Sequence, residues 1–276
     1  MKGGNMRPWH GIGLAAACAG MICLAAGGAV AGPAEETRWQ VLQDLYFAGR
    51  TVEEAGPVVS LEAPTRAHDA ALVPIRVATA PAPGVAVTAV HLIVDNNPVP
   101  LAMVLRFPDG TRPHAVDTRL RVDAYTNITA VAETADGRLL KTARFVKAAG
   151  GCSAPSPKNA QLAALRLGKM KLNLPETVST GKPATAQLLI SHPNYTGFQY
   201  DQLNHYYIPA HYVKTIGVRY NGEPVLDVEA DISMSEDPSL HFTIVPEKEG
   251  TLEVVAEDTK GRIFKESWPI RTTPGS

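Results

Sequence analysis

A single cysteine stands in the middle of the chain, among residues with small side chains. Gly150 and Gly151 precede Cys152, and Ser153 and Ala154 follow it. A thiolate is both a nucleophile and a leaving group, so a cysteine can take up a sulfur-containing group and later release it. Glycines lack a Cβ atom and tolerate positive φ, which keeps the backbone thin and adaptable. These five residues therefore predict an exposed, flexible arm with the thiol as its working group. In an oxidising compartment such a lone thiol pairs between chains, stays free or carries a bound group.

Two other interpretations of Cys152 remain open. A buried structural cysteine is common in proteins, although this stretch offers no large apolar neighbour to define a core position. A thiol enzyme would need a base held at fixed geometry beside the sulfur, and a flexible arm does not provide one. The residue types therefore favour a carrier over a catalyst.

Other side chains that could bind ligands show no recognisable spacing. His205 and His211 lie six residues apart, without a third ligand at a spacing typical of metal sites. Asp231, Glu236 and Asp237 match no calcium-binding loop. The sequence also lacks a nucleophile elbow and a glycine-rich phosphate loop. We therefore expect no metal and no cofactor.

The N-terminus has the features of an export signal over residues 1–31. Basic residues precede an apolar stretch at 11–28, which ends at an Ala-Val-Ala cleavage motif. Removal of this segment would take Cys18 and Cys23 with it and leave Cys152 as the only thiol. The prediction is a periplasmic protein that has no membrane segment after processing. A retained membrane anchor and lipoprotein processing at Cys18 are the alternatives.

Composition narrows the possible partners. The 276 residues carry a formal net charge of -1, with 45% hydrophobic and 19% charged residues. A nearly neutral chain argues against nucleic acid or an anionic membrane as an obligate partner. The length is sufficient for one large domain or two of ordinary size.

Short β-rich runs separated by turn residues predict an all-β protein. Residues 36–48 are the exception, since Trp39, Leu42, Leu45 and Tyr46 recur at helical spacing and predict one short helix packed on a sheet. The predicted strands cover residues 71–80, 86–95, 100–107, 116–125, 128–135, 139–146, 186–192, 213–221, 240–246, 250–258 and 262–270.

The two series of strands echo each other. Residues 131–141 align without gaps on residues 255–265, with six of eleven positions identical, and residues 94–99 lie over residues 220–225. A match of this length at a fixed offset indicates two related β-sandwiches in tandem, which we expect to bury a shared face. The alternative is coincidence between hairpins that use few residue types.

The ordered motifs resemble the SoxYZ sulfur-oxidation carriers, with both subunits fused in one chain. VDNNPVPLA, AVAETADGRL and VKAAGGC, the last ending at Cys152, are similar to SoxY, whereas SHPNYTGF, RYNGEPVL and GTLEVVAEDTKG are similar to SoxZ. The resemblance implies immunoglobulin-like sandwiches, a SoxY-like domain at 32–149, a carrier-cysteine linker at 150–164 and a SoxZ-like domain at 165–276. It also implies that Cys152 is the covalent attachment site.

The resemblance is strongest to fused carriers associated with quinoprotein dehydrogenases. It implies partners among periplasmic sulfur-oxidising, quinoprotein or cytochrome enzymes and a sulfur-containing small molecule on Cys152. The family arm is a free Gly-Gly-Cys-Gly-Gly terminus, whereas Ser153 and Ala154 replace the last two glycines here and more chain follows. We therefore expect a non-catalytic periplasmic carrier. The alternative is a module that recruits a quinoprotein dehydrogenase without covalent chemistry.

Overall fold

The structure is a computed structural model. It describes residues 1, 33–155, 164–175 and 178–274. The predicted signal peptide, apart from Met1, and most of the predicted linker lie outside the described residues. The described residues from Pro33 onward form one compact unit, which is described below.

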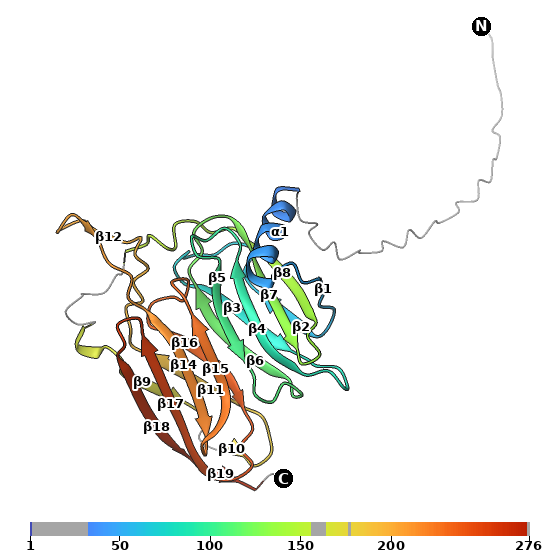
Figure 1. The fold of residues 1–276 in the computed structure, drawn as a ribbon, viewed down its shortest axis with the longest axis vertical. Helices are drawn as coiled ribbons and strands as arrows, with labels where there is room; N and C mark the ends of the chain where they lie inside the picture. Colours follow the sequence, from blue (N-terminus) through green and yellow to red (C-terminus); the bar gives the residue numbers. More distant parts are fainter. Residues whose placement is uncertain (2–32, 156–163, 176–177, 275–276) are drawn as a thin grey trace. The chain divides into compact units, whose positions relative to one another are not determined.

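The larger of two main sheets has nine strands (Figure 1). In spatial order they are β1 (Val52–Glu54), β8 (Leu139–Val146), β7 (Thr126–Thr134), β4 (Val87–Val94), β5 (Leu101–Arg106), β15 (Glu223–Ala230), β14 (Val213–Tyr220), β17 (Gly250–Asp258) and β18 (Ile263–Ile270).

The second sheet has six strands, and two short pairs lie apart from both sheets. The six are β2 (Val59–Glu62), β3 (Val73–Thr79), β6 (His114–Leu120), β16 (Ser239–Ile244), β11 (Ala184–Ile190) and β9 (Met170–Asn173). The short pairs are β10 (Val178–Ser179) with β19 (Thr272–Thr273), and β12 (Tyr200–Asp201) with β13 (Tyr206–Tyr207).

Alternating side chains create the core between the sheets. In β17, Leu252, Val254 and Ala256 are fully buried, whereas Glu253 and Val255 between them are exposed. Successive side chains of a strand point to opposite faces, so one face of each strand lines the interior. The inward faces of both sheets contribute to one contiguous apolar cluster. The prediction of an all-β, immunoglobulin-like sandwich fold is confirmed.

The two halves of the chain repeat one topology. In the larger sheet, the order β8-β7-β4-β5 of the N-terminal half (β1–β8) meets the order β15-β14-β17-β18 of the C-terminal half (β9–β19). The echoing sequences form the equivalent hairpins β7–β8 and β17–β18. The halves join through edge strands, since β5 pairs with β15 and β6 pairs with β16, both antiparallel. The two sheets therefore run through both halves, and buried residues of both halves belong to one core cluster.

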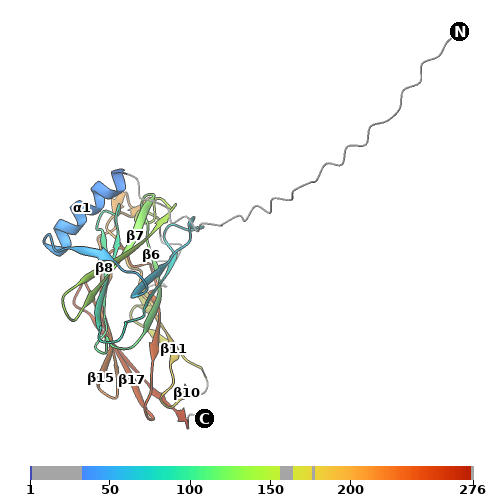
Figure 2. The same cartoon turned by 90° about the vertical axis from the view of Figure 1, so that its right-hand side faces the viewer.

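The predicted helix is α1 (Pro33–Phe47). Its residues Trp39 and Leu42 pack on Ile93, Val131 and Leu139, which lie on the side of β4, β7 and β8 that faces away from the main core. Figure 2 shows α1 against these strands. Among the described residues, no helix is both long and apolar enough to cross a membrane.

Candidate functional site

Cys152 lies on a docked segment, not on an exposed arm. Its side chain belongs to the buried set, with 1% of the residue exposed. The backbone N–H groups of Gly150 and Gly151 donate to the carbonyls of Asp123 (2.9 Å) and Val122 (3.0 Å). The N–H of Cys152 donates to Oδ1 of Asp123 at 3.2 Å. The prediction of an exposed, flexible cysteine is therefore wrong for this structure, because the segment that follows β6 binds the arm along its backbone.

The two glycines serve different purposes. Gly150 has φ of +80° with open space around it, as the prediction of an adaptable backbone requires. Gly151 instead allows close packing. A Cβ atom on it would lie 2.7 Å from the carbonyl oxygen of Val122 and closer still to that of Ala70. Gly151 therefore fixes the arm in place and does not act as a hinge.

Residues of the C-terminal half close over the arm. Thr196 Oγ1 donates to the carbonyl of Cys152 at 2.6 Å, and Gln199 Nε2 donates to the carbonyl of Ala154 at 2.9 Å. Gln199 Oε1 also accepts from the N–H of Thr196 at 3.2 Å. Both side chains are buried. We refer to Thr196 and Gln199 as the clamp, because they bind the arm from the C-terminal half, whereas Asp123 binds it from the N-terminal half.

A buried guanidinium lies close to the arm. Arg121 is 1% exposed, and its Nη1 donates to the carbonyl of Gly151 at 3.2 Å. Its Nε and Nη2 have no hydrogen-bond partner among the described residues. Burial lowers the pKa of Arg121, whereas the charges of Glu236, Cys152 and Asp69 oppose that shift. Arginine stays protonated in proteins, so a positive charge with unused donors lies beside the cysteine.

The thiol is inert in this position. Burial raises the pKa of Cys152 to about 12; the charge of Asp123 acts in the same direction, while that of Arg121 opposes it. The thiolate is the reactive form of cysteine. At neutral pH the docked thiol is therefore protonated, and its chemistry requires the arm to move.

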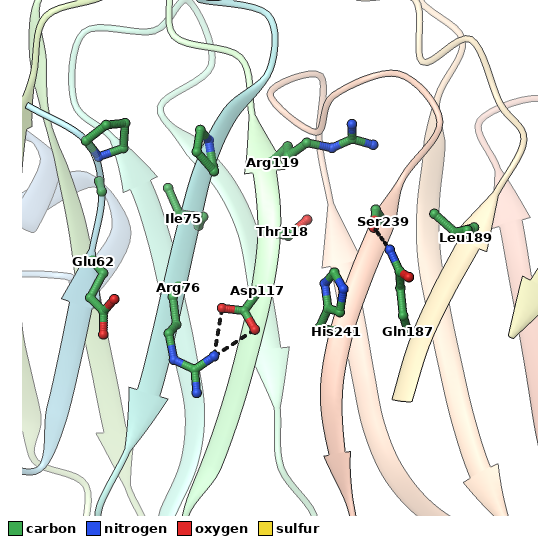
Figure 3. Close-up of a pocket in the computed structure, with 13 residues that line it drawn as sticks. Glu62, Ile75, Arg76, Asp117, Thr118, Arg119, Gln187, Leu189, Ser239 and His241 are labelled. Atoms are coloured by element: carbon green, nitrogen blue, oxygen red, sulfur yellow. Dashed lines mark hydrogen bonds and ion pairs between the residues drawn. The ribbon is translucent and has the colours of Figure 1, made fainter. Parts of the chain in front are cut away.

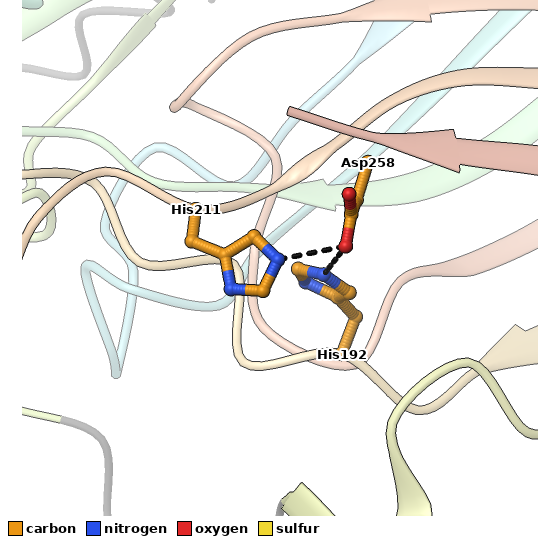
Figure 4. Close-up of side chains that lie close together, drawn as sticks. All are labelled: His192, His211 and Asp258. Atoms are coloured by element: carbon orange, nitrogen blue, oxygen red, sulfur yellow. Dashed lines mark hydrogen bonds and ion pairs between the residues drawn. The ribbon is translucent and has the colours of Figure 1, made fainter. Parts of the chain in front are cut away.

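A buried cluster of His192, His211 and Asp258 was not predicted from the sequence (Figure 4). His211 Nε2 lies 2.7 Å from Asp258 Oδ2, and His192 Nε2 lies 3.6 Å from the same oxygen. Sequence spacing had paired His211 with His205, which is exposed. No local pattern links His192 to Asp258, because 66 positions separate them.

The donor geometry of this cluster favours hydrogen bonding over metal binding. The three candidate ligand atoms lie within 4.8 Å of one another. However, the backbone N–H of Asn194 donates to Nδ1 of His192 at 3.1 Å, so the neutral ring carries its proton on Nε2. A metal-bound histidine has the reverse arrangement, with its other nitrogen donating. Burial and the charge of His211 lower the pKa of His192 to about 4, so the ring is neutral near pH 7.

The cluster fixes the base of the clamp. Asp258 Oδ1 accepts from the N–H groups of Lys260 and Arg262 in the β17–β18 turn. His211, bound to the other oxygen, pairs through its backbone with Tyr195 at 2.8 and 2.9 Å. Thr196 of the clamp follows directly. The cluster therefore ties the β17–β18 turn to the loop that covers Cys152.

A groove of about 730 Å³ crosses the six-stranded sheet where the halves meet (Figure 3). Arg76 and Asp117 pair across it at 2.8 Å, and Gln187 donates to Ser239 at 3.2 Å. Thr118 and Arg119 also line the groove, and Thr118 Oγ1 and Arg119 Nε have no hydrogen-bond partner among the described residues. Cys152 does not line it.

Comparisons with known proteins divide the chain in two. The family model described as sulfur oxidation protein SoxY matches residues 43–152, and that described as sulphur oxidation protein SoxZ matches residues 170–269. No curated protein shows significant similarity.

Solved structures resemble parts of the fold. The sulfur carrier protein SoxY from Chlorobium limicola f thiosulfatophilum is 23% identical, with 41% of this chain and 94% of that chain covered and a TM-score of 0.35. The superoxide reductase (neelaredoxin) from Ignicoccus hospitalis is 18% identical, with 38% of this chain and 80% of that chain covered and a TM-score of 0.28. Neither likeness is close enough to carry an argument about function.

Proposed function

Because the chain belongs to the SoxYZ proteins of sulfur oxidation, with a SoxY segment followed by a SoxZ segment, we propose that it carries sulfur compounds covalently on Cys152. The SoxY match ends at this residue. Cys152 is also the one free cysteine among the described residues. The observation that carries the proposal is that both halves of the chain bind this arm. Asp123 of the N-terminal half and the clamp of the C-terminal half each form hydrogen bonds to it.

The carrier reaction needs no catalyst on this chain. In an adduct, the Sγ of Cys152 is bonded to a second sulfur. A thiolate of the receiving enzyme attacks that second sulfur, a new S–S bond forms, and Cys152 leaves as a thiolate that then takes up a proton. This transfer balances without an outside oxidant, whereas loading of the free thiol with sulfite or thiosulfate is a two-electron oxidation whose oxidant the loading enzyme has to hold. We therefore propose a protein without catalytic activity of its own, whose partners load and unload the thiol.

The surroundings of Cys152 suit a charged cargo. Arg121 presents a buried positive charge and unused donors beside the arm. Guanidinium groups bind oxyanions through charge-assisted hydrogen bonds. Periplasmic location, export by residues 1–31 and partners among sulfur-oxidising, quinoprotein or cytochrome enzymes are parts of the same proposal. They rest on the sequence features and on the family resemblance.

Intact-mass analysis of protein purified from its native host tests the proposal. We expect an added mass of sulfur, sulfite or thiosulfate that maps to Cys152 and is lost on reduction. The Cys152→Ala variant should lack this mass and should fail to support sulfur oxidation. An unmodified thiol in the wild type, together with full pathway activity of Cys152→Ala, would leave a non-covalent recruitment module as the function.

A further inference from the structure

Exposed apolar side chains gather on one hairpin. Twelve large apolar residues are exposed in the part of the chain that the structure describes, and five of them fall within ten positions. They are Phe198, Tyr200, Leu203, Tyr206 and Tyr207. Leu203 at the tip is 90% exposed and Tyr207 is 66% exposed. Figure 1 shows this β12–β13 hairpin projecting from the sheets. Clustered exposure of this kind marks an interaction surface, and tyrosine is enriched in such surfaces.

The root of the hairpin is the clamp over Cys152. Gln199 directly precedes β12, and its carbonyl accepts from the N–H of Ile208 on the returning strand at 2.9 Å. Thr196 Oγ1, besides binding the carbonyl of Cys152, accepts from the N–H of Phe198 at 3.1 Å. The same few residues therefore hold the hairpin together and hold the arm down. Displacement of the hairpin pulls on both hydrogen bonds to the arm.

The chain beneath the hairpin is fixed. Asn194 is fully buried, with its Oδ1 accepting from the N–H of Val213 and its Nδ2 donating to the carbonyl of Ser235. Tyr195 and His211 pair through their backbones above it. Gly197, with φ of +91°, separates Thr196 from Phe198. Motion of the hairpin is thereby confined to the residues beyond Tyr195, which include the clamp.

We propose that residues 198–208 are the docking surface for the enzyme that exchanges sulfur with Cys152, and that docking there withdraws the clamp and exposes the thiol. This inference rests on the proposed carrier function. Between residues 193 and 213 the sequence holds no lysine or arginine and a single acidic residue, Asp201. The partner surface is therefore apolar and weakly charged, and its association depends little on ionic strength.

This clamp, opened by docking, acts as a gate and explains how a carrier protects its empty thiol. With the clamp closed, Cys152 is shielded from solvent and its thiol is protonated. Opening restores an ordinary thiol environment, and with it the reactivity that exchange requires. The sulfur becomes reactive where a partner is already bound, so side reactions with other thiols are suppressed.

The clamp is tested on the isolated protein with an aromatic disulfide as the thiol probe. Thr196→Val and Gln199→Leu each remove one hydrogen bond to the arm, so we expect the exchange rate of Cys152 to rise about fivefold per bond, and more in the double variant. Thr180→Val is the matched control, since Thr180 Oγ1 binds the carbonyl of Thr273 in the β10–β19 pair. Unchanged rates in both folded clamp variants would overturn the gate.

Docking is tested by the loading of Cys152 in the native host. Leu203→Ser and Tyr207→Ser remove exposed apolar contacts, so the isolated variants should fold and keep the slow wild-type exchange rate. We expect their adduct level to fall at least tenfold, whereas Ile263→Ser, an exposed change on β18, should load normally.

The outcomes separate the two proposals. If wild type and hairpin variants carry the same level of adduct on Cys152, the docking proposal is overturned and the carrier proposal stands. An unloaded wild type overturns the carrier and with it the docking partner, while the exchange rates still decide whether the clamp exists. Analytical sedimentation of the isolated protein measures whether a second copy of the chain binds the hairpin. If the protein self-associates and Leu203→Ser abolishes this, the proposal that an enzyme binds the hairpin is overturned.

Discussion

Replacement of Gly151 by alanine should undock the arm. The added Cβ atom would lie 2.7 Å from the carbonyl oxygen of Val122, where ordinary van der Waals contact begins at 3.4 Å. It would overlap the carbonyl of Ala70 more severely. Both obstacles are backbone atoms, and the N–H of Val122 donates to Ala70 at 2.8 Å. Because the Ala70 carbonyl cannot turn away without loss of that bond, the arm is the part that moves.

The size of the effect follows from the overlap. Overpacking of this kind costs about 1–3 kcal/mol, and each 1.36 kcal/mol corresponds to a factor of ten in an equilibrium constant. The open population of the arm should therefore increase by about 5- to 150-fold. The docked thiol has a pKa of about 12, against an ordinary value of 9.0, so nearly all reaction passes through the open form.

Exchange of Cys152 with an aromatic disulfide under native conditions measures this population. Gly151→Ala should react faster than the wild type by the factor above, while thermal unfolding shows that the variant is folded. Gly137→Ala is the control, because Gly137 in the β7–β8 turn has φ of +84° and open space around it. A rate for Gly151→Ala within twofold of the wild type, or an equal rise in Gly137→Ala, would refute the reasoning.

Two further predictions concern the buried His192 near the clamp and the packing of α1 on the sheet. His192 has a folded-state pKa of about 4 against 6.5, so the unfolded chain takes up the proton first. Stability should be complete above about pH 6.5 and fall by up to about 3 kcal/mol as the pH drops to about 4, which denaturant titrations would detect. The His192→Gln variant should lose most of this slope and keep the part due to His91, whose pKa is also lowered by burial, so an undiminished slope would contradict the assignment. Leu42→Ala on α1 should cost about 2–5 kcal/mol of unfolding free energy, whereas Leu45→Ala, at a position 66% exposed, should change it by less than about 0.5 kcal/mol. Equal costs at both positions would show that α1 does not pack as described.

The local sequence pattern was sufficient to predict α1 and most of the strands. The strand predicted at 250–258 is β17, Gly250–Asp258, because a short run of β-branched and apolar residues bounded by turn residues is enough to indicate a strand. β15 was not predicted, since Glu223–Ala230 begins with a glutamate and a proline and alternates weakly. This strand pairs with β14 through the local turn at Asn221 and Gly222, and on its other side with β5, about 120 residues earlier in the chain. Non-local pairing of that kind leaves little trace in a single strand's sequence.

The burial of Cys152 was not predicted from the sequence. Small side chains around Cys152 suggested mobility, yet they equally permit a backbone to pack against carbonyl oxygens, as Gly151 does. The residues that bury the thiol lie far away in the sequence, since Thr196 follows Cys152 by 44 positions. The available signal was Arg121, an arginine at the end of an otherwise alternating strand, whose charge needs a partner when buried.

Fusion changes what a carrier cysteine has to do. A cysteine on a free terminus can travel to an enzyme, whereas Cys152 is followed by more chain and is held on both sides by the two halves. Its reach is therefore short, and the enzyme has to approach the sulfur. An exposed apolar surface beside the thiol is then of direct use, because binding there and opening of the arm become one event. The edge-to-edge joining of the sheets makes this possible, since it places the clamp of one half over the arm of the other at a fixed position.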